Sequence, residues 1–187
     1  MSRTKSPESA QAASARSRRR GVVTLELIVV TPIIAIMLSA VVEFGIMLAG
    51  ITQLSASARA GAKIASELST ADLASAAPAV NINLVQAAVD NVLGSAGMTS
   101  CTVILDHNPT CGGLVAATKS AGGGCGGACA APATALPTIA LIPGGSVRVT
   151  VCVDATQLAP NLLTTFGYDL TGQVVSESIT LPYENCP

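Results

Sequence analysis

Residues 18–65 read RRRGVVTLELIVVTPIIAIMLSAVVEFGIMLAGITQLSASARAGAKIA, and this stretch decides the architecture of the chain. No charged residue occurs between Leu27 and Val42, and almost every position there is apolar or small. As a helix this run covers about 24 Å, and a few more residues at each end make it long enough for the ~30 Å apolar layer of a bilayer. Glu26 and Glu43 then lie near the two faces of that layer. The stretch therefore predicts a membrane-spanning helix.

The charged residues are divided unevenly along the chain. Residues 1–21 carry six basic residues and one acidic residue, a net charge of +5, whereas the rest carries four basic and ten acidic residues, a net charge of −6. Basic residues flank membrane helices on the cytoplasmic side. We therefore expect residues 1–21 to be a basic cytoplasmic leader without regular structure, and the C-terminal part to be exported. Because the leader is short and attached to an apolar helix, nucleic-acid binding is disfavoured.

Glu26 requires a reason, because a carboxylate in a membrane helix costs about 2.5–3.5 kcal/mol at the bilayer centre and less near an interface. One interpretation places it among the lipid headgroups. The other is that cleavage after Gly21 gives Val22 a free α-amino group, which lies one helical turn from Glu26. The carboxylate could then also interact with the unpaired amides and the positive dipole end of the new helix start.

This segment resembles the processing site of type IV prepilins and pseudopilins, where a basic leader and a Gly precede the cut and a Glu and a membrane helix follow. More narrowly, it resembles the TadE-like pseudopilins of the tight-adherence (Flp pilus) machinery. The membrane-helix features shared with that family are Pro32, the step Glu43-Phe44-Gly45 and the small-residue helix at 57–65.

The resemblance implies a minor pilin-like structural subunit of a bacterial tight-adherence pilus or related secretion assembly. It implies processing after Gly21 by a prepilin peptidase, with Gly21, Val22 and Glu26 forming the processing site. The implied partners are that peptidase, other pilin or pseudopilin subunits, an inner-membrane assembly platform and membrane lipid. The chain would lie in the bacterial inner membrane as a single-pass protein with a cytoplasmic N-terminus, before any incorporation into a pilus. Two departures from the family pattern, Val22 for an aromatic residue and Ala60 for an acidic one, leave the peptidase preference and the helix surface open.

The membrane helix and its extension are expected to cover residues 22–68, followed by an exported domain at 69–187. A stripe of small and apolar residues recurs in the extension at three- and four-residue steps: Ile51, Leu54, Ala58, Ala62 and Ala65. A second amphipathic helix is expected from Asn81 to Leu93, with an apolar face of Ile82, Val85, Val89 and Val92 and with Gly94 at its end. Strands are expected at 101–106, 146–153 and 173–181. The predicted fold class is α+β, with an antiparallel sheet of about three strands.

Cysteines provide the other structural signal in the exported domain. Disulfides are expected there, among Cys101, Cys111, Cys125, Cys129, Cys152 and Cys186. Three of the six lie in a Gly-rich loop at 108–135, whose composition cannot build a core. If the three strands form a meander, Cys101 lies near Cys152 and Cys111 near Cys186, which leaves Cys125 and Cys129 to pair within the loop.

No catalytic constellation stands out in the sequence. His107 is the only histidine, which excludes a two-histidine metal site within one chain, and we expect it at the surface at a strand end. Cys125 and Cys129 have roughly the spacing of a zinc hook, but no second closely spaced pair accompanies them. We therefore expect a protein that is not an enzyme and has no metal or cofactor. The alternatives are an uncleaved single-pass envelope protein whose disulfide-bonded ectodomain binds a partner or ligand, and an enzyme with a cysteine-bound metal.

Overall fold

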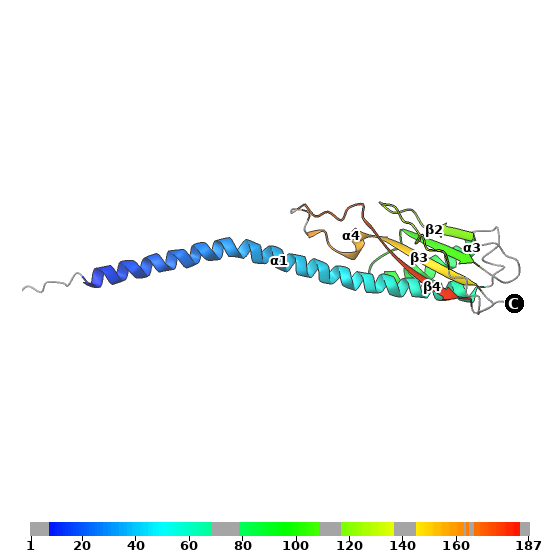
Figure 1. Cartoon of the computed structure of the whole chain (residues 1–187), viewed down its shortest axis with the longest axis horizontal. Helices are drawn as coiled ribbons and strands as arrows, with labels where there is room; N and C mark the ends of the chain where they lie inside the picture. The colour runs from blue at the N-terminus through cyan, green and yellow to red at the C-terminus, as the bar shows by residue number, and fades with distance from the viewer. Residues whose placement is uncertain are drawn as a thin grey trace, which may run out of the picture. The chain divides into compact units, whose positions relative to one another are not determined.

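The computed structural model describes residues 8–68, 79–108, 117–136, 145–162, 164 and 167–183, with the side chains of the first helix described from Thr24 onward. The chain divides into two compact units, Met1–Val42 and Glu43–Pro187. Helix α1 (Glu8–Glu67) contributes to both units (Figure 1).

In the first unit, α1 is the element that the structure describes. Its helical backbone begins at Glu8, so it includes residues for which the sequence predicted no regular structure. Pro32 lies inside the helix and has no N–H to donate to the carbonyl one turn earlier. The hydroxyl of the preceding Thr31 donates to the carbonyl of Leu27 at 2.6 Å. This polar side chain is thus satisfied within the helix, as an apolar environment requires.

The second unit contains a four-stranded antiparallel sheet in the order β2-β1-β3-β4 (Figure 1). Its strands are β1 (Thr102–Asn108), β2 (Ala117–Ala121), β3 (Ser146–Asp154) and β4 (Val174–Pro182). The predicted α+β fold with an antiparallel sheet of about three strands is confirmed: the three expected strands lie close to their expected bounds, and a fourth strand extends the sheet. The additional strand β2 lies inside the segment predicted to be a Gly-rich loop, and its sequence ATKSA has few of the residues that favour strands.

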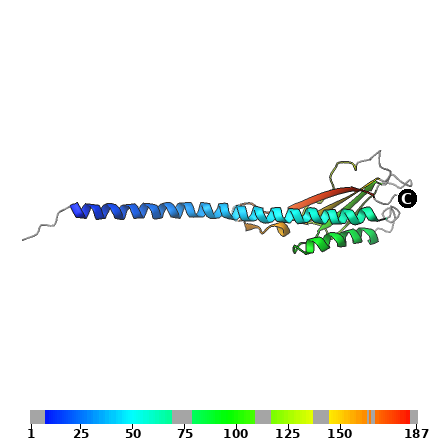
Figure 2. The same cartoon turned by 90° about the horizontal axis from the view of Figure 1, so that it is seen from below.

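The core lies between one face of this sheet and two helices, α1 and α3 (Ala79–Gly94) (Figure 2). Alternate residues of β1 and β3 share the covered face and are fully buried: Val103, Leu105, Val147, Val149, Val151 and Val153. The helices contribute Leu54, Ala58, Ala62, Ala65, Ile82, Val85, Val89 and Leu93. The stripe expected on α1 is confirmed, except that Ile51 is only half-buried. On α3, Leu93 takes the position predicted for Val92, because a step of four residues from Val89 keeps the same helix face.

Helix α1 lies close to both α3 and β3 at Gly61. A Cβ atom at this position would lie 2.7 Å from Cγ2 of Val89 and 3.2 Å from Cγ1 of Val149. The surrounding core is made mostly of Val, Ala and Leu, consistent with a chain that is 2% aromatic. Tight backbone approach therefore replaces large side chains as the source of packing in this core.

We expect Gly61→Leu to lower the free energy of unfolding by about 2–3 kcal/mol, because the new side chain enters a filled interface. Leu favours a helix over Gly by nearly 1 kcal/mol. A net loss of stability in Gly61→Leu would therefore show that the cost of packing the new side chain outweighs its higher helix propensity. Gly45→Leu is the matched control on the same helix, since nothing lies within 4 Å of a Cβ at Gly45. Denaturant unfolding in one detergent measures both, and equal stability of the two variants would contradict the close approach.

The short helix α4 (Ala155–Leu158) follows β3 directly and packs on α1. A Cβ atom at Gly50 would lie 2.7 Å from Cδ2 of Leu158.

Further along the chain, hydrogen bonds from the backbone and side chain of Thr171 and from Asn161 hold the pKa of the exposed Asp169 carboxyl below its usual range. These contacts connect Asn161 with the turn before β4.

Candidate functional site

The N-terminal helix exposes its apolar side chains. Within Thr24–Glu67, α1 is long and apolar enough to cross a membrane, and none of its most apolar window is buried. Leu25, Leu27 and Val41 are 69%, 66% and 68% exposed. An exposed apolar surface of this extent marks contact with lipid or with other proteins. The helix is therefore consistent with membrane anchoring.

The predicted processing residues lie on successive turns of this helix. Gly21 and Val22 both have helical backbone, and Glu26 is exposed. The four-residue spacing between Val22 and Glu26 is the one at which neighbouring turns of a helix meet. The assignment of these three residues to processing stays a prediction.

Glu43, the acidic residue of the predicted Glu-Phe-Gly step, is buried in the second unit. It is 4% exposed, and neither of its carboxylate oxygens has a hydrogen-bond partner within the described part of the chain. Met47 and Gly50 follow at steps of four and three residues, so they share its helix face. Met47 packs on the small cluster that contains Leu170, and Gly50 lies against Leu158. Glu43 therefore faces the domain, at a cost in free energy that marks it as a candidate functional position.

The sequence predicted that Glu43 lies near one face of the apolar layer of a bilayer. It did not predict that the side chain is buried in the domain. The signal that would have indicated burial is the backward continuation of the buried stripe of α1. Steps of four, three and four residues connect Glu43 through Met47 and Gly50 to Leu54. The other two residues of the step, Phe44 and Gly45, are exposed.

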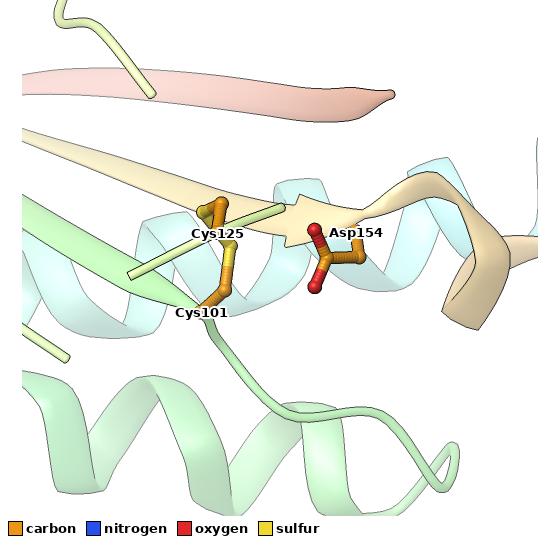
Figure 3. Close-up of side chains that lie close together, drawn as sticks. All are labelled: Cys101, Cys125 and Asp154. Carbon is orange, nitrogen blue, oxygen red and sulfur yellow. A yellow bond between two sulfur atoms is a disulfide. The ribbon is translucent and has the colours of Figure 1, made fainter. Parts of the chain in front are cut away.

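Two disulfides fasten the Gly-rich segment to the sheet. They join Cys101 to Cys125 (Figure 3) and Cys129 to Cys152, with Cα–Cα distances of 4.9 and 6.0 Å. The expectation of disulfides is confirmed, but the expected pairing of Cys101 with Cys152 and of Cys125 with Cys129 is wrong. The pairing expected for Cys111 with Cys186 lies outside the described residues.

The strand register explains the error in pairing. Cys101 does lie beside Cys152, as expected, and its N–H donates to the Cys152 carbonyl at 2.9 Å. The residue opposite Cys152 in the sheet is Thr102, so Cys101 is displaced by one residue. Because successive residues of a strand face opposite sides of a sheet, this displacement keeps the two side chains from facing each other, and Sγ of Cys101 lies 3.2 Å from the backbone carbonyl of Cys152. Each therefore bonds to a cysteine of the Gly-rich segment instead.

Glycines allow that segment to lie directly on the backbone of the sheet. Gly122 has φ +126°, and a Cβ there would collide with the carbonyl of Cys101. A Cβ at Gly127 would lie 2.5 Å from the carbonyl oxygen of Gly172 and 3.0 Å from Cγ2 of Val174. The Gly-rich composition thus reflects close packing on the strands.

A buried ion pair lies on the face of the sheet opposite the helices. Asp106 of β1 and Arg148 of β3 are directly opposite each other in the register, and Nη2 of Arg148 lies 2.8 Å from Oδ2 of Asp106. The other carboxylate oxygen accepts a hydrogen bond from the Thr118 hydroxyl at 2.7 Å. Nη1 of Arg148 donates to the Thr134 carbonyl at 2.6 Å. The pair therefore connects three strands with the Gly-rich segment that covers them.

Cys101, Cys125 and Asp154 also come together at this end of the sheet (Figure 3). Their potential ligand atoms lie within 4.8 Å of one another. The two sulfurs are bonded to each other, so they cannot bind an ion as thiolates. Oδ1 of Asp154 accepts a hydrogen bond from the N–H of Gly126 at 3.0 Å. The cluster thus fastens the Gly-rich segment to the end of β3.

His107 is buried rather than at the surface as predicted. It is 1% exposed and belongs to β1. Alternation along the strand places it on the same face as Val103 and Leu105, against the core. The sequence prediction ended the strand two residues too early, at 106 instead of Asn108, which left His107 out of this alternation.

Comparison with known proteins bears on the N-terminal helix. Residues 21–63 match the family described as TadE-like protein. No curated protein and no solved structure matches the chain. The matched segment begins at Gly21 and includes Pro32 and the step Glu43-Phe44-Gly45. The N-terminal helix of the chain is thus similar to TadE-like proteins over residues 21–63.

Proposed function

We propose that the chain is a minor pilin-like structural subunit of a bacterial tight-adherence (Flp) pilus or of a related secretion assembly. The observation that carries this proposal is the family match over residues 21–63. It begins at the glycine after which a prepilin peptidase would cut, and it covers an apolar helix whose side chains are exposed. The role is structural rather than enzymatic.

The same helix would hold the subunit in the inner membrane as a single-pass protein. A net charge of +5 in residues 1–21 favours a cytoplasmic N-terminus. The disulfides Cys101–Cys125 and Cys129–Cys152 favour an exported, oxidising location for the second unit. This topology places the domain where it can join a filament outside the cytoplasm.

Cleavage after Gly21 would create a new contact for Glu26. The new α-amino group of Val22, of the same chain or of a neighbouring subunit, would pair with the Glu26 carboxylate, an interaction strengthened by an apolar surrounding. The partners in this sequence of events are the prepilin peptidase, other pilin or pseudopilin subunits, the inner-membrane assembly platform and membrane lipid.

Gly21→Leu is expected to leave the leader attached, because a side chain at this position keeps the backbone from approaching the peptidase closely. The measurement is the intact mass of the chain purified from cells that contain a prepilin peptidase. Wild type should lack residues 1–21 and begin at Val22.

Glu26→Gln is the control for this experiment. It should still be cut, because cleavage depends on Gly21, while its incorporation into pili should fall. A wild-type chain that keeps residues 1–21, or that is cut elsewhere, would overturn the proposal. That result would instead support an uncleaved envelope protein whose disulfide-bonded ectodomain binds a partner.

A further inference from the structure

The end of the sheet at which β1 begins and β3 ends holds three potential metal ligands in one cluster. Cys101 precedes β1, Asp154 is the last residue of β3, and Cys125 comes from the Gly-rich segment (Figure 3). Their sulfur and carboxylate oxygen atoms lie within 4.8 Å of one another. In the residues that the structure describes, no other three side chains of cysteine, histidine, aspartate or glutamate form such a group. The chemistry of a metal site is therefore concentrated at this end of the sheet.

The carboxylate of Asp154 is used by the Gly-rich segment and not by the helix that follows it. Asp154 directly precedes α4, where an aspartate usually accepts a hydrogen bond from the first N–H groups of the helix, but its side chain makes no such bond. It accepts one from the N–H of Gly126, the residue after Cys125, at 3.0 Å. An ionised carboxylate has about four lone-pair sites. This single hydrogen bond therefore holds the carboxylate beside the sulfurs and leaves it able to bind an ion.

Two thiolates and one carboxylate are a suitable ligand set for Zn²⁺. This ion binds Cys sulfur at about 2.3 Å and Asp oxygen at about 2.0–2.2 Å in tetrahedral geometry, so its ligand atoms lie roughly 3.6–3.8 Å apart. The separation of up to 4.8 Å in the cluster is close enough for side-chain rotation to close it. Ions that prefer oxygen ligands, such as Mg²⁺ and Ca²⁺, are disfavoured by the two sulfurs.

Reduction of the Cys101–Cys125 disulfide is the step that makes this ligand set available. It breaks the S–S bond and adds two electrons and two protons, which a dithiol reductant supplies as it is oxidised to its own disulfide. Metal binding then releases the two thiol protons to water. We propose that the reduced domain binds one thiophilic divalent cation, with Zn²⁺ as the model ion, through Cys101, Cys125 and Asp154, with water as the fourth ligand.

The disulfide and the metal ion hold the same segment in two redox states. In the oxidised domain the disulfide and the Gly126 hydrogen bond fasten the Gly-rich segment to the end of the sheet. In the reduced domain the ion connects the same strands to the same segment. Cys125 and Asp154 are half-buried, so a reductant and an ion can reach them from solvent. The proposal concerns the second unit alone and does not rest on processing after Gly21.

The second disulfide provides an internal comparison. Neither Cys129 nor Cys152 belongs to a group of three potential ligands in the described part of the chain, and Cys152 is fully buried. Reduction of this disulfide gives two thiols without a neighbouring carboxylate. The metal site is therefore specific to one of the two described disulfides.

Titration with Co²⁺ tests the proposal in the full chain, purified in detergent micelles. Cys111→Ser and Cys186→Ser are present in every sample, so that of six cysteines only the four of the described disulfides remain. After reduction by a phosphine and removal of bound metal, one equivalent of Co²⁺ should produce thiolate-to-cobalt charge-transfer absorption and the visible bands of a tetrahedral complex. Zn²⁺ should displace the Co²⁺ and abolish both signals. The oxidised chain should produce neither.

Asp154→Asn separates the carboxylate from the thiols. The amide oxygen still accepts the hydrogen bond of Gly126, but binding of Co²⁺ and Zn²⁺ should weaken at least tenfold, because loss of even an outer partner of a metal ligand costs about 10–100-fold. Asp169→Asn, the same chemical change at an exposed carboxylate outside the cluster, should bind as tightly as the parent chain. Cys129→Ser should do the same.

Thermal unfolding, followed by circular dichroism, gives a second measurement that does not depend on the reduced chain being stable without metal. Zn²⁺ should raise the Tm of the reduced parent chain and of Asp169→Asn more than that of Asp154→Asn, because an ion that binds the folded state stabilises it. A reduced parent chain that neither binds Co²⁺ nor gains stability from Zn²⁺ overturns the proposal.

Three other results would also overturn it. They are equal binding by Asp154→Asn and the parent chain, equal binding by the oxidised and reduced chains, and a loss in Cys129→Ser as large as that in Asp154→Asn. The first two place the ion elsewhere, and the third indicates a site made of four thiols. Metal binding by a chain that proves to be uncleaved would leave this proposal standing while refuting the proposed processing.

Discussion

Asp106→Leu is expected to lower the free energy of unfolding of the second unit by about 3–5 kcal/mol, because it leaves the Arg148 guanidinium buried without its carboxylate. Both side chains of the pair are only 10% exposed. The Thr118 hydroxyl loses its acceptor in the same change. Since single domains are stable by only about 5–15 kcal/mol, this loss should be visible in denaturant unfolding of the full chain in detergent.

The double variant Asp106→Leu with Arg148→Met should recover much of this loss, because an apolar replacement of a buried ion pair is often nearly neutral. Breaking the exposed pair of Lys63 and Glu67, whose charged atoms are 4.0 Å apart, provides the control. Lys63→Met should change stability by less than about 1 kcal/mol. If Asp106→Leu cost no more than Lys63→Met, the network on this face of the sheet would not be buried.

The parts of the fold that could be predicted are those in which one buried face makes apolar residues recur at a regular spacing. The buried stripe of α1 repeats at three- and four-residue steps, so its members were identified before their packing partners were known. Strand β3, SVRVTVCVD, alternates because its Val residues all face the core. Both patterns arise from one covered face, and each was confirmed.

Features that depend on register or on distant partners could not be predicted. Strand β2 was missed because its side chains contribute little to the core and its hydrogen bonds to β1 are not visible in a polar sequence. The predicted disulfide pairing was wrong because Cys101 lies one residue out of register with Cys152. Asp106 and Arg148 are 42 residues apart, and nothing local to either one indicates the other.

The residues of the candidate site also differ in whether local sequence or distant partners determine them. Gly21, Val22 and Glu26 were identified by their order and spacing along one helix, and the family match covers all three. The burial of Glu43 was missed because it depends on the segment near Leu170, which packs on that helix face from more than a hundred residues away. Local patterns are thus enough to predict processing residues, while the environment of Glu43 depends on tertiary packing.

Replacing all four cysteines of the two described disulfides by serine is expected to have the largest effect on stability. The pairs Cys101–Cys125 and Cys129–Cys152 span 24 and 23 residues, and each cross-link contributes about 3 kcal/mol through the entropy of the unfolded chain. Losing both should bring the second unit close to unfolding, given its core of small side chains. Denaturant unfolding of the reduced wild type measures the same loss of stability. Non-reducing peptide mapping tests the pairing, and a linked Cys101–Cys152 peptide would contradict it.

The two disulfides and the buried ion pair should also depend on each other. The disulfides hold the Gly-rich segment on the sheet, and that segment supplies the Thr134 carbonyl that accepts a hydrogen bond from Arg148. Without the disulfides, water reaches the pair more easily, and an exposed ion pair contributes little. Asp106→Leu should therefore cost less after disulfide reduction than before it, with a coupling of about 1–2 kcal/mol in a double-mutant cycle. Equal costs in both backgrounds would mean that the segment covers the ion pair without help from its disulfides.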